Sequence, residues 1–169
     1  MIPVLTDLHF GARGDSEHIK YFQKQFFEQV FWPEVDAHSG VTDILCLGDV
    51  LDRRKYVNFD TLKFAKRMFF AQAQKRNLRV HWLIGNHDMY FKDSMSLTCG
   101  RAFKEVTNIV PYYGPTVVDF EGEPTLMLPW VCKENQAQTI QMVKTFTGST
   151  VAGHLELSGF EMHKGFLCS

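Results

Sequence analysis

Four apolar runs in this chain each stop at polar, metal-ligating side chains, and this repeated pattern restricts the fold more than any other feature. Short apolar runs predict buried strands, and a glycine lets the backbone turn sharply where a strand ends. In open α/β sheets, sites form at the carboxyl ends of the strands. The runs and their polar ends are Ile2 to Leu5 before Thr6-Asp7-Leu8-His9, Asp43 to Leu47 before Gly48-Asp49-Val50-Leu51-Asp52-Arg53, Val80 to Ile84 before Gly85-Asn86-His87-Asp88, and Ser149 to Ala152 before Gly153-His154.

A long helix is expected between the first two strands. Asp15 or Ser16 caps its start, and Pro33 with the Ser39-Gly40 pair brings it to an end. We interpret its wide apolar stripe as core packing, with a partner interface as the alternative. The stripe has one face at helical spacing, Ile19, Phe22, Phe26 and Val30, widened by Tyr21, Phe27 and Phe31.

The remaining segments alternate between helical and extended patterns. Asn58 is expected to cap a second helix that ends near Arg76. The alternation predicts a layered α/β fold with helices outside a sheet. The other expected elements are a helix over Ser94 to Val106, a hairpin of Thr116 to Phe120 with Thr125 to Leu128, and a polar surface helix over Lys133 to Phe146.

Length and composition are those of one soluble globular domain. The 169 residues are 45% hydrophobic and 22% charged, and the formal net charge is -1, so no global attraction to nucleic acid or to an anionic membrane is expected. The four cysteines include no Cys-x-x-Cys pair, which argues against a zinc ribbon or thioredoxin-like motif. No secretory signal or membrane span is recognisable, so we expect a cytoplasmic protein with free thiols.

The polar strand ends contain a set of ligands suited to divalent metals. Asp7 and His9 lie two residues apart, so an extended backbone would direct both to one face. Asp49 adds carboxylate oxygens, Asn86 an amide oxygen and His154 an imidazole. This mixture of oxygen and nitrogen suits Mn, Fe or Zn. Two ions about 3.5 to 4 Å apart could share Asp49 and activate water against a phosphate ester.

Three neighbouring residues have the chemistry of catalytic groups. His87 is placed to donate a proton to the leaving oxygen, Asp52 to orient His87, and Arg53 to contact phosphate through two hydrogen bonds. Turn formation or core packing could explain each polar residue singly, but four strand ends together favour a site. The histidines without this context, interpreted as structural or surface residues, are His18, His38, His81 and His163.

The motifs Asp7-x-His9, Gly48-Asp49-x-x-Asp52-Arg53, Gly85-Asn86-His87-Asp88 and Gly153-His154 together resemble the ordered motifs of the calcineurin-like metallophosphoesterases. The resemblance implies a layered β-sandwich flanked by helices. It also implies that Asp7, His9 and Asp49 hold one metal ion and that Asp49, Asn86 and His154 hold the other. His87 is then the catalytic histidine.

Within that superfamily, Asp-Leu-His-Phe-Gly near the start, Gly-Asp-Val-Leu-Asp and the late Gly-His-Leu look most like the SbcD-type DNA-repair nucleases and their phage recombination relatives. This narrower resemblance implies a manganese-dependent DNA exonuclease and endonuclease of DNA repair and recombination, with Mg, Fe or Zn as alternative metals. It also implies an SbcC-type ATPase partner and a homodimer.

One motif of that family is missing. The family closes its site with a Gly-His-x-His motif, and this chain contains none. Since no histidine lies between Asp88 and Gly153, His154 corresponds to the earlier histidine ligand. We therefore expect residues 1–169 to form a single metallophosphoesterase domain, truncated before the last metal-binding motif, with weakened metal affinity and activity.

Two other functions remain open at this stage. The metal motifs do not select the leaving group, so a phosphomonoesterase or cyclic-nucleotide phosphodiesterase is the alternative enzyme. A non-catalytic subunit or interaction module with the same fold is the alternative outside enzymes, and its wide aromatic stripe would then bind a partner.

Overall fold

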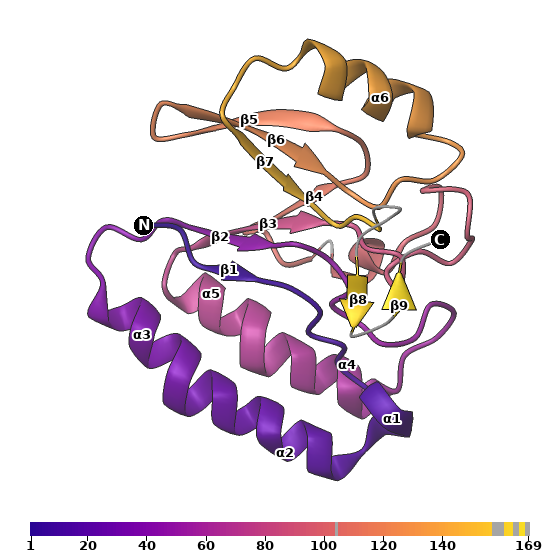
Figure 1. The fold of residues 1–169 in the computed structure, drawn as a ribbon. Helices are drawn as coiled ribbons and strands as arrows, with labels where there is room; N and C mark the ends of the chain where they lie inside the picture. The colour runs from indigo at the N-terminus through magenta and orange to yellow at the C-terminus, as the bar shows by residue number, and fades with distance from the viewer. Residues whose placement is uncertain (104, 157–160, 164–165, 168–169) are drawn as a thin grey trace.

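Figure 1 shows the computed structural model of the chain, which describes residues 1–103, 105–156, 161–163 and 166–167. Long helices cover one face of a parallel sheet, a second sheet lies over its other face, and helix α6 (Gln136–Thr145) lies beyond the second sheet (Figure 1). The predicted layered α/β fold, with two sheets flanked by helices, is confirmed.

The first sheet consists of four parallel strands in the order β1-β2-β3-β4. Three of them, β1 (Val4–Leu5), β2 (Asp43–Cys46) and β3 (Arg79–Leu83), confirm predicted strands, whereas β4 (Ile109–Tyr112) was not predicted. Because the strands are parallel, the segments that follow β1, β2 and β3 leave the same edge of the sheet. Three of the four polar strand ends are therefore neighbours.

The second sheet brings the fourth polar end to the same place. It has the order β5-β6-β7, and β5 (Thr116–Phe120) pairs antiparallel with β6 (Glu123–Leu128) in the predicted hairpin. Strand β7 (Thr150–Gly153) runs parallel to β6, and the backbone N–H of His154 donates to the Leu128 carbonyl at 3.0 Å. Two short strands, β8 (Glu161–His163) and β9 (Phe166–Leu167), pair with each other.

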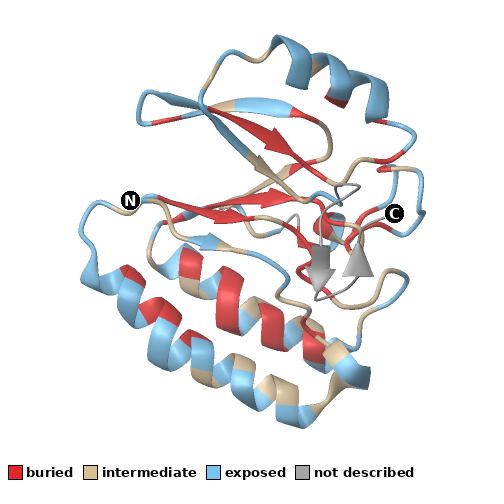
Figure 2. Cartoon of the chain, in the orientation of Figure 1, coloured by how far each residue is buried: buried red, intermediate tan, exposed pale blue. Residues whose placement is uncertain are grey.

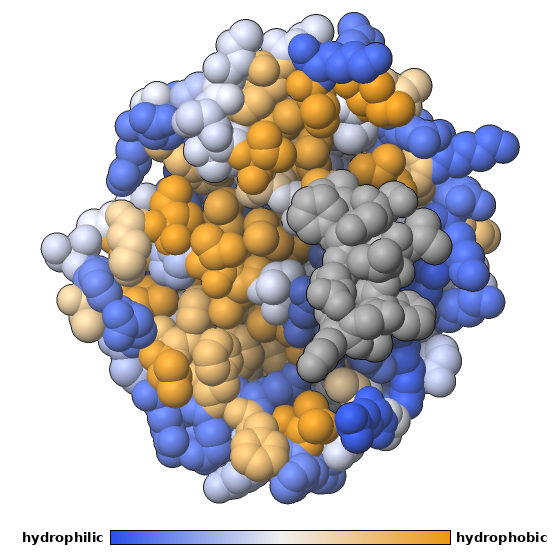
Figure 3. All heavy atoms as spheres, viewed as in Figure 1, coloured by the Kyte–Doolittle hydropathy of each residue, from blue (hydrophilic) through white to orange (hydrophobic). Residues whose placement is uncertain are grey.

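The apolar core lies in two layers, one on each face of the parallel sheet (Figure 2). Between the sheets, Leu83, Tyr112 and Met127 pack together. Between the parallel sheet and the helices, aromatic side chains such as Phe69 and Trp82 are fully buried. Figure 3 shows apolar side chains over the exposed edges of both sheets, where Val4 of β1 and Val151 of β7 are 54% and 53% exposed.

The first long helix runs past the proline that was expected to stop it. After the short α1 (Ala12–Asp15), the chain forms α2 (Glu17–Phe26), a π-helical turn η1 (Phe27–Phe31) and α3 (Trp32–Ala37). Pro33 lies in the first turn of α3. The wider π-helical turn before it reduces the clash that a proline ring otherwise makes with the preceding turn. The helix therefore ends only at Ala37, just before the Ser39-Gly40 pair.

The predicted core face of this helix was also wrong. Phe22, Phe26 and Val30 are 54%, 39% and 57% exposed, whereas Phe27 and Phe31 are buried. The sequence carries two overlapping apolar stripes, and the buried one makes aromatic contacts with Phe10, Trp32 and Phe69. Helical spacing alone does not distinguish the two stripes.

The second long helix confirms its prediction. It comprises α4 (Phe59–Ala65), the π-helical turn η2 (Lys66–Phe70) and α5 (Ala71–Lys75). The Asn58 side chain accepts a hydrogen bond from the Asp60 amide at 3.0 Å and so caps the first turn.

The helix predicted over Ser94 to Val106 is wrong. The described part of that segment contains turns and one short 3₁₀ helix, η3 (Cys99–Phe103). The Ser94 hydroxyl accepts from the Ser96 amide at 3.1 Å, and the Cys99 amide donates to the Asp88 carbonyl at 2.8 Å. These local bonds replace the helical ladder over residues 94–99. Helix α6, in contrast, confirms the predicted surface helix, although it is shorter at both ends.

Candidate metal centre

The loops after β1 and β2 interlock through backbone hydrogen bonds. The Asp7 amide donates to the Gly48 carbonyl at 3.1 Å, and the His9 amide donates to the Asp49 carbonyl at 2.9 Å. Asp7, His9 and Asp49 all have positive φ angles, 53°, 43° and 53°, so the extended Asp7-x-His9 backbone expected from the sequence is wrong. Left-handed backbone at non-glycine residues is strained and clusters at functional sites.

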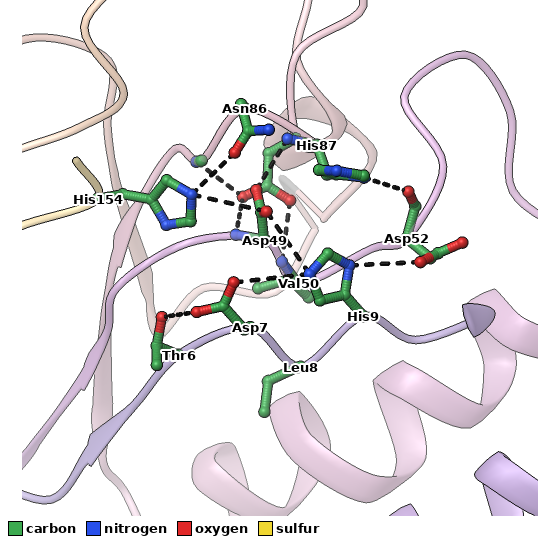
Figure 4. A network of polar contacts seen from close by, with 12 residues as sticks. Thr6, Asp7, Leu8, His9, Asp49, Val50, Asp52, Asn86, His87 and His154 are labelled. Carbon is green, nitrogen blue, oxygen red and sulfur yellow. Dashed lines mark hydrogen bonds and ion pairs between the residues drawn. The ribbon is translucent and has the colours of Figure 1, made fainter. Parts of the chain in front are cut away.

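The three side chains nevertheless converge (Figure 4). His9 Nε2 lies 3.6 Å from Asp7 Oδ1 and 3.6 Å from Asp49 Oδ2. These distances are too long for hydrogen bonds but resemble the spacing of ligand atoms around one ion, about 3 to 3.5 Å for bonds near 2.1 Å. Asp49 is buried, whereas the Asp7 side chain is 52% exposed, so the group opens to solvent on the Asp7 side.

His154 and Asn86 form the other half of the cluster around Asp49. His154 Nε2 lies 2.9 Å from Asn86 Oδ1 and 3.6 Å from Asp49 Oδ2. His154 Nδ1 lies 2.7 Å from the Leu47 carbonyl, an acceptor that fixes the proton on Nδ1. In that tautomer Nε2 presents a lone pair toward the Asn86 oxygen, so two electron-rich atoms face each other. A cation bound between them would interact favourably with both atoms.

Two glycines allow this close approach. A Cβ on Gly48 would lie 2.6 Å from His154 Nδ1, and one on Gly85 would collide with the Asp49 carboxylate. Gly48 also has a φ of 111°, which side chains rarely tolerate. The Gly-Asp and Gly-Asn pairs of the sequence are therefore needed for space at the cluster as well as for turning the chain.

Asp88 holds the backbone of the cluster loops in place from the protein interior. It was not predicted as a site residue. It is fully buried and accepts hydrogen bonds from the amides of Asp49 and Gly85 and from the Trp82 indole, at 2.9, 3.0 and 3.0 Å. Burial raises the pKa of the Asp88 carboxyl, and the hydrogen bonds from Gly85, Cys99 and Trp82 counteract part of this rise. Its place after Gly85-Asn86-His87 was the signal that could have found it.

His87 faces the cluster from the side opposite His154. Its backbone amide donates to Asp49 Oδ1 at 2.8 Å, and its ring meets that of His9 edge to face at 4.9 Å. Asp52 contacts His87 as expected, but through its backbone carbonyl, 2.5 Å from Nδ1. The Asp52 carboxylate instead lies 3.4 Å from His9 Nδ1. With Nδ1 held by the carbonyl, His87 Nε2 is the nitrogen available for proton transfer.

Arg53 makes protein contacts. Its Nη1 donates to Asp15 Oδ2 at 2.8 Å, and its guanidinium lies 5.0 Å from the centre of the Tyr56 ring. Asp15 is also held by the Thr61 hydroxyl at 2.6 Å. The phosphate contact expected of Arg53 stays a prediction. It requires the guanidinium either to bind phosphate while it keeps its hydrogen bond to Asp15 or to break that bond.

The donor set fits a divalent metal. Two groups in the described part of the chain bring ligand atoms within 4.8 Å of one another: Asp7 with His9 and Asp49, and His9 with Asp52 and His87. His9 Nδ1 is buried and has no hydrogen-bond partner among the described residues. Carboxylate, imidazole and amide ligands of this kind suit Mn, Fe or Zn.

The other predicted structural features agree where they are described. His81 is buried between Asp43, 2.8 Å away, and Tyr112, 2.7 Å away, whereas His18 and His38 are exposed. The thiols of Cys46, Cys99 and Cys132 are free, and the side chains of His163 and Cys168 lie outside the described residues. None of the helices that the structure describes has the length and apolar character of a membrane span.

The chain belongs to the calcineurin-like phosphoesterase family, whose profile matches residues 2–166. A curated relative, exonuclease subunit 1 of enterobacteria phage T4, is 32% identical over 162 residues. The aligned region covers 95% of this chain and 47% of that protein, so the chain spans about half the length of this relative. A solved structure of a protein of unknown function from Aquifex aeolicus has a TM-score of 0.45 and 17% identity, covering 85% of this chain and 70% of that one.

Proposed function

We propose that this chain is a metallophosphoesterase domain that hydrolyses the phosphodiester bonds of DNA with two divalent metal ions, manganese by preference. The observation that carries the proposal is the convergence of His9 and His154 on one oxygen of Asp49, each at 3.6 Å. A single buried carboxylate flanked by two imidazoles is the arrangement expected of a ligand that two ions share.

The ligands divide into two sets around Asp49. Asp7 and His9 would hold one ion with Asp49, and Asn86 and His154 would hold the other. When bound, the ions lower the pKa of water and neutralise phosphate oxygens. The Leu47 carbonyl and the Asp88 hydrogen bonds keep His154 and Asp49 in position without taking part in the reaction.

His87 supplies the acid chemistry. Its Nδ1 proton is engaged by the Asp52 carbonyl, so a proton on Nε2 can pass to the leaving oxygen and leave the ring neutral. His9, one of the proposed ligands, contacts the His87 ring, and both residues are partly exposed. In this proposal Asp52 therefore positions the His87 ring through its backbone carbonyl.

The motif resemblance to the SbcD-type DNA-repair nucleases favours DNA as the substrate, and the relative named above is an exonuclease subunit. By the same motif resemblance we propose a larger recombination and repair complex with an SbcC-type ATPase and a second copy of this chain. The match to that relative spans 95% of this chain.

Parallel assays of a DNA oligonucleotide and a small chromogenic phosphate monoester, with manganese, test the proposal. We expect cleavage of DNA that is lost in Asp49→Ala. Hydrolysis of the monoester or of a cyclic nucleotide without DNA cleavage would replace the nuclease by a small-molecule phosphoesterase. Activity on neither substrate, together with unchanged function of His87→Ala in a complex, would favour the non-catalytic subunit.

A further inference from the structure

Asn86 lines a groove beside the candidate metal centre. The loop after β2, the turn after β3 and the segment between β6 and α6 form it. Asn86 belongs both to this groove and to the cluster, because its Oδ1 contacts His154 Nε2. A molecule bound at the centre could therefore continue into the groove. Its residues include Arg54, Lys92, Asp93, Trp130, Lys133 and Gln136.

The groove carries unneutralised positive charge. Its walls present three cations, Arg54, Lys92 and Lys133, against one carboxylate, Asp93. In the part of the chain that the structure describes, none of these three cations forms an ion pair, whereas Arg53, Arg76 and Arg79 each do. Arg54 is partly ordered, because its Nε donates to the Met89 carbonyl at 3.1 Å. Polyanions are the ligands that such a surface attracts.

Trp130 gives the groove a rigid aromatic wall. Its backbone is held on both sides, since its amide donates to the Ile84 carbonyl at 2.8 Å and its carbonyl accepts from Asn135 Nδ2 at 3.0 Å. The indole lies 6.0 Å from the His154 ring, centre to centre, and is only half-buried. The other two tryptophans, Trp32 and Trp82, are buried in the core.

We propose that this groove binds a single-stranded segment of the nucleic acid that flanks the scissile phosphate, with one base stacked on Trp130 and phosphates on Lys92, Lys133 and Arg54. Cationic side chains beside a partly exposed aromatic ring are the combination that holds single strands, because every base has a stacking face. The inference rests on the proposed nuclease function and specifies its substrate as a strand unpaired beside the cut.

Binding of a fluorescein-labelled oligothymidylate tests the groove separately from catalysis. In EDTA at low salt, we expect Trp130→Ala to weaken binding by about 5- to 100-fold and Trp130→Phe to restore most of it. Binding should also quench the tryptophan emission of the parent chain, but not that of Trp130→Phe, because the remaining tryptophans are buried.

The lysines have a matched control. Lys133→Ala and Lys92→Ala should each reduce the slope of log affinity against log salt by about 0.7, the value for one lost phosphate contact on a single strand. Lys144→Ala changes an exposed lysine of α6 outside the groove and should leave the slope unchanged. Circular dichroism of each variant confirms that it is folded.

The outcomes separate the two proposals. No binding by the parent chain, or equal binding by the parent and Trp130→Ala, overturns the groove proposal. If Asp49→Ala alone abolishes DNA cleavage while Trp130→Ala binds like the parent, the nuclease stands and the groove proposal fails. If the parent binds through Trp130 but cleaves no DNA, the groove stands and the nuclease fails.

Discussion

His154 Nε2 meets Asn86 Oδ1 at 2.9 Å although the two residues follow strands of different sheets. His154 follows β7 of the mixed sheet, and Asn86 follows β3 of the parallel sheet. The candidate metal centre therefore depends on how the two sheets pack. Substitutions that shift one sheet against the other should affect metal binding even where they touch no ligand.

Replacing His87 by alanine should remove the proton donor and leave the metal ligands in place. We expect the rate of DNA cleavage to fall by about 10²- to 10⁴-fold, the usual range for a lost general acid, with unchanged manganese affinity. Steady-state kinetics and calorimetry measure the two quantities. His38→Ala, at an exposed histidine, is the control. Cleavage at the parent rate by His87→Ala would refute the catalytic role.

Asp88→Asn should destabilise the fold strongly. Asp88 Oδ2 accepts from Asp49 N and Gly85 N, and Oδ1 accepts from Val50 N at 3.0 Å, so an amide NH₂ on either side would face a donor. We expect a loss of about 2 to 4 kcal/mol in the free energy of unfolding, measured with urea. Asp93→Asn, at an exposed position, should change it by less than about 0.5 kcal/mol. Equal stability of the two variants would contradict the role of Asp88.

Gly48 and Gly40 form a matched pair. Both have positive φ angles, 111° and 78°, but an added Cβ would press on His154 at Gly48 and meet nothing within 4 Å at Gly40. Gly40→Ala should lower the free energy of unfolding by about 1 kcal/mol through backbone strain alone. Gly48→Ala should lower it further and should weaken manganese binding, because His154 must move. Calorimetry that shows the same metal affinity for both variants would refute the clash.

Stability at acid pH should depend on Asp43. Burial alone would raise the pKa of this carboxyl, but hydrogen bonds from Thr42, His81 and Arg79 outweigh burial and hold the pKa below its usual range. The pKa of Asp43 is lower in the folded chain than in the unfolded chain, where it is about 4. The ionised carboxylate therefore stabilises the fold fully above about pH 4, and this stabilisation is lost as the pH falls through the folded-state pKa.

The difference in melting temperature between the parent chain and Asp43→Asn should therefore be constant above about pH 5 and shrink below about pH 4. Thermal unfolding followed by circular dichroism across this range measures it. A difference that grows on acidification would show that the pKa is not lowered.

The strand ends were predictable because their signal is local. An apolar run followed by ligand-type side chains identified β1, β2, β3 and β7, with a glycine between the two for all but β1, and parallel pairing then brings the first three ends together. Strand β4 was missed, because Pro111 lies inside it and its residues lack a polar end.

Other features depend on contacts between distant segments. Which stripe of the first helix is buried depends on Phe69, from the second helix, against Phe27. The place of Asp88 depends on amides that the β2 loop directs toward it. The orientation of His87 depends on a backbone carbonyl, which carries no sequence signal.

Manganese titration of the parent chain and of Asp49→Ala by calorimetry tests the central claim most directly, with Asp93→Ala as the matched control. Because Asp49 Oδ2 lies 3.6 Å from both His9 and His154, we expect the parent to bind two ions, with affinity weakened by the missing Gly-His-x-His motif, and Asp49→Ala to lose both. Circular dichroism must show the variant folded. Binding of the same number of ions with the same affinity by Asp49→Ala would contradict a shared centre at this residue.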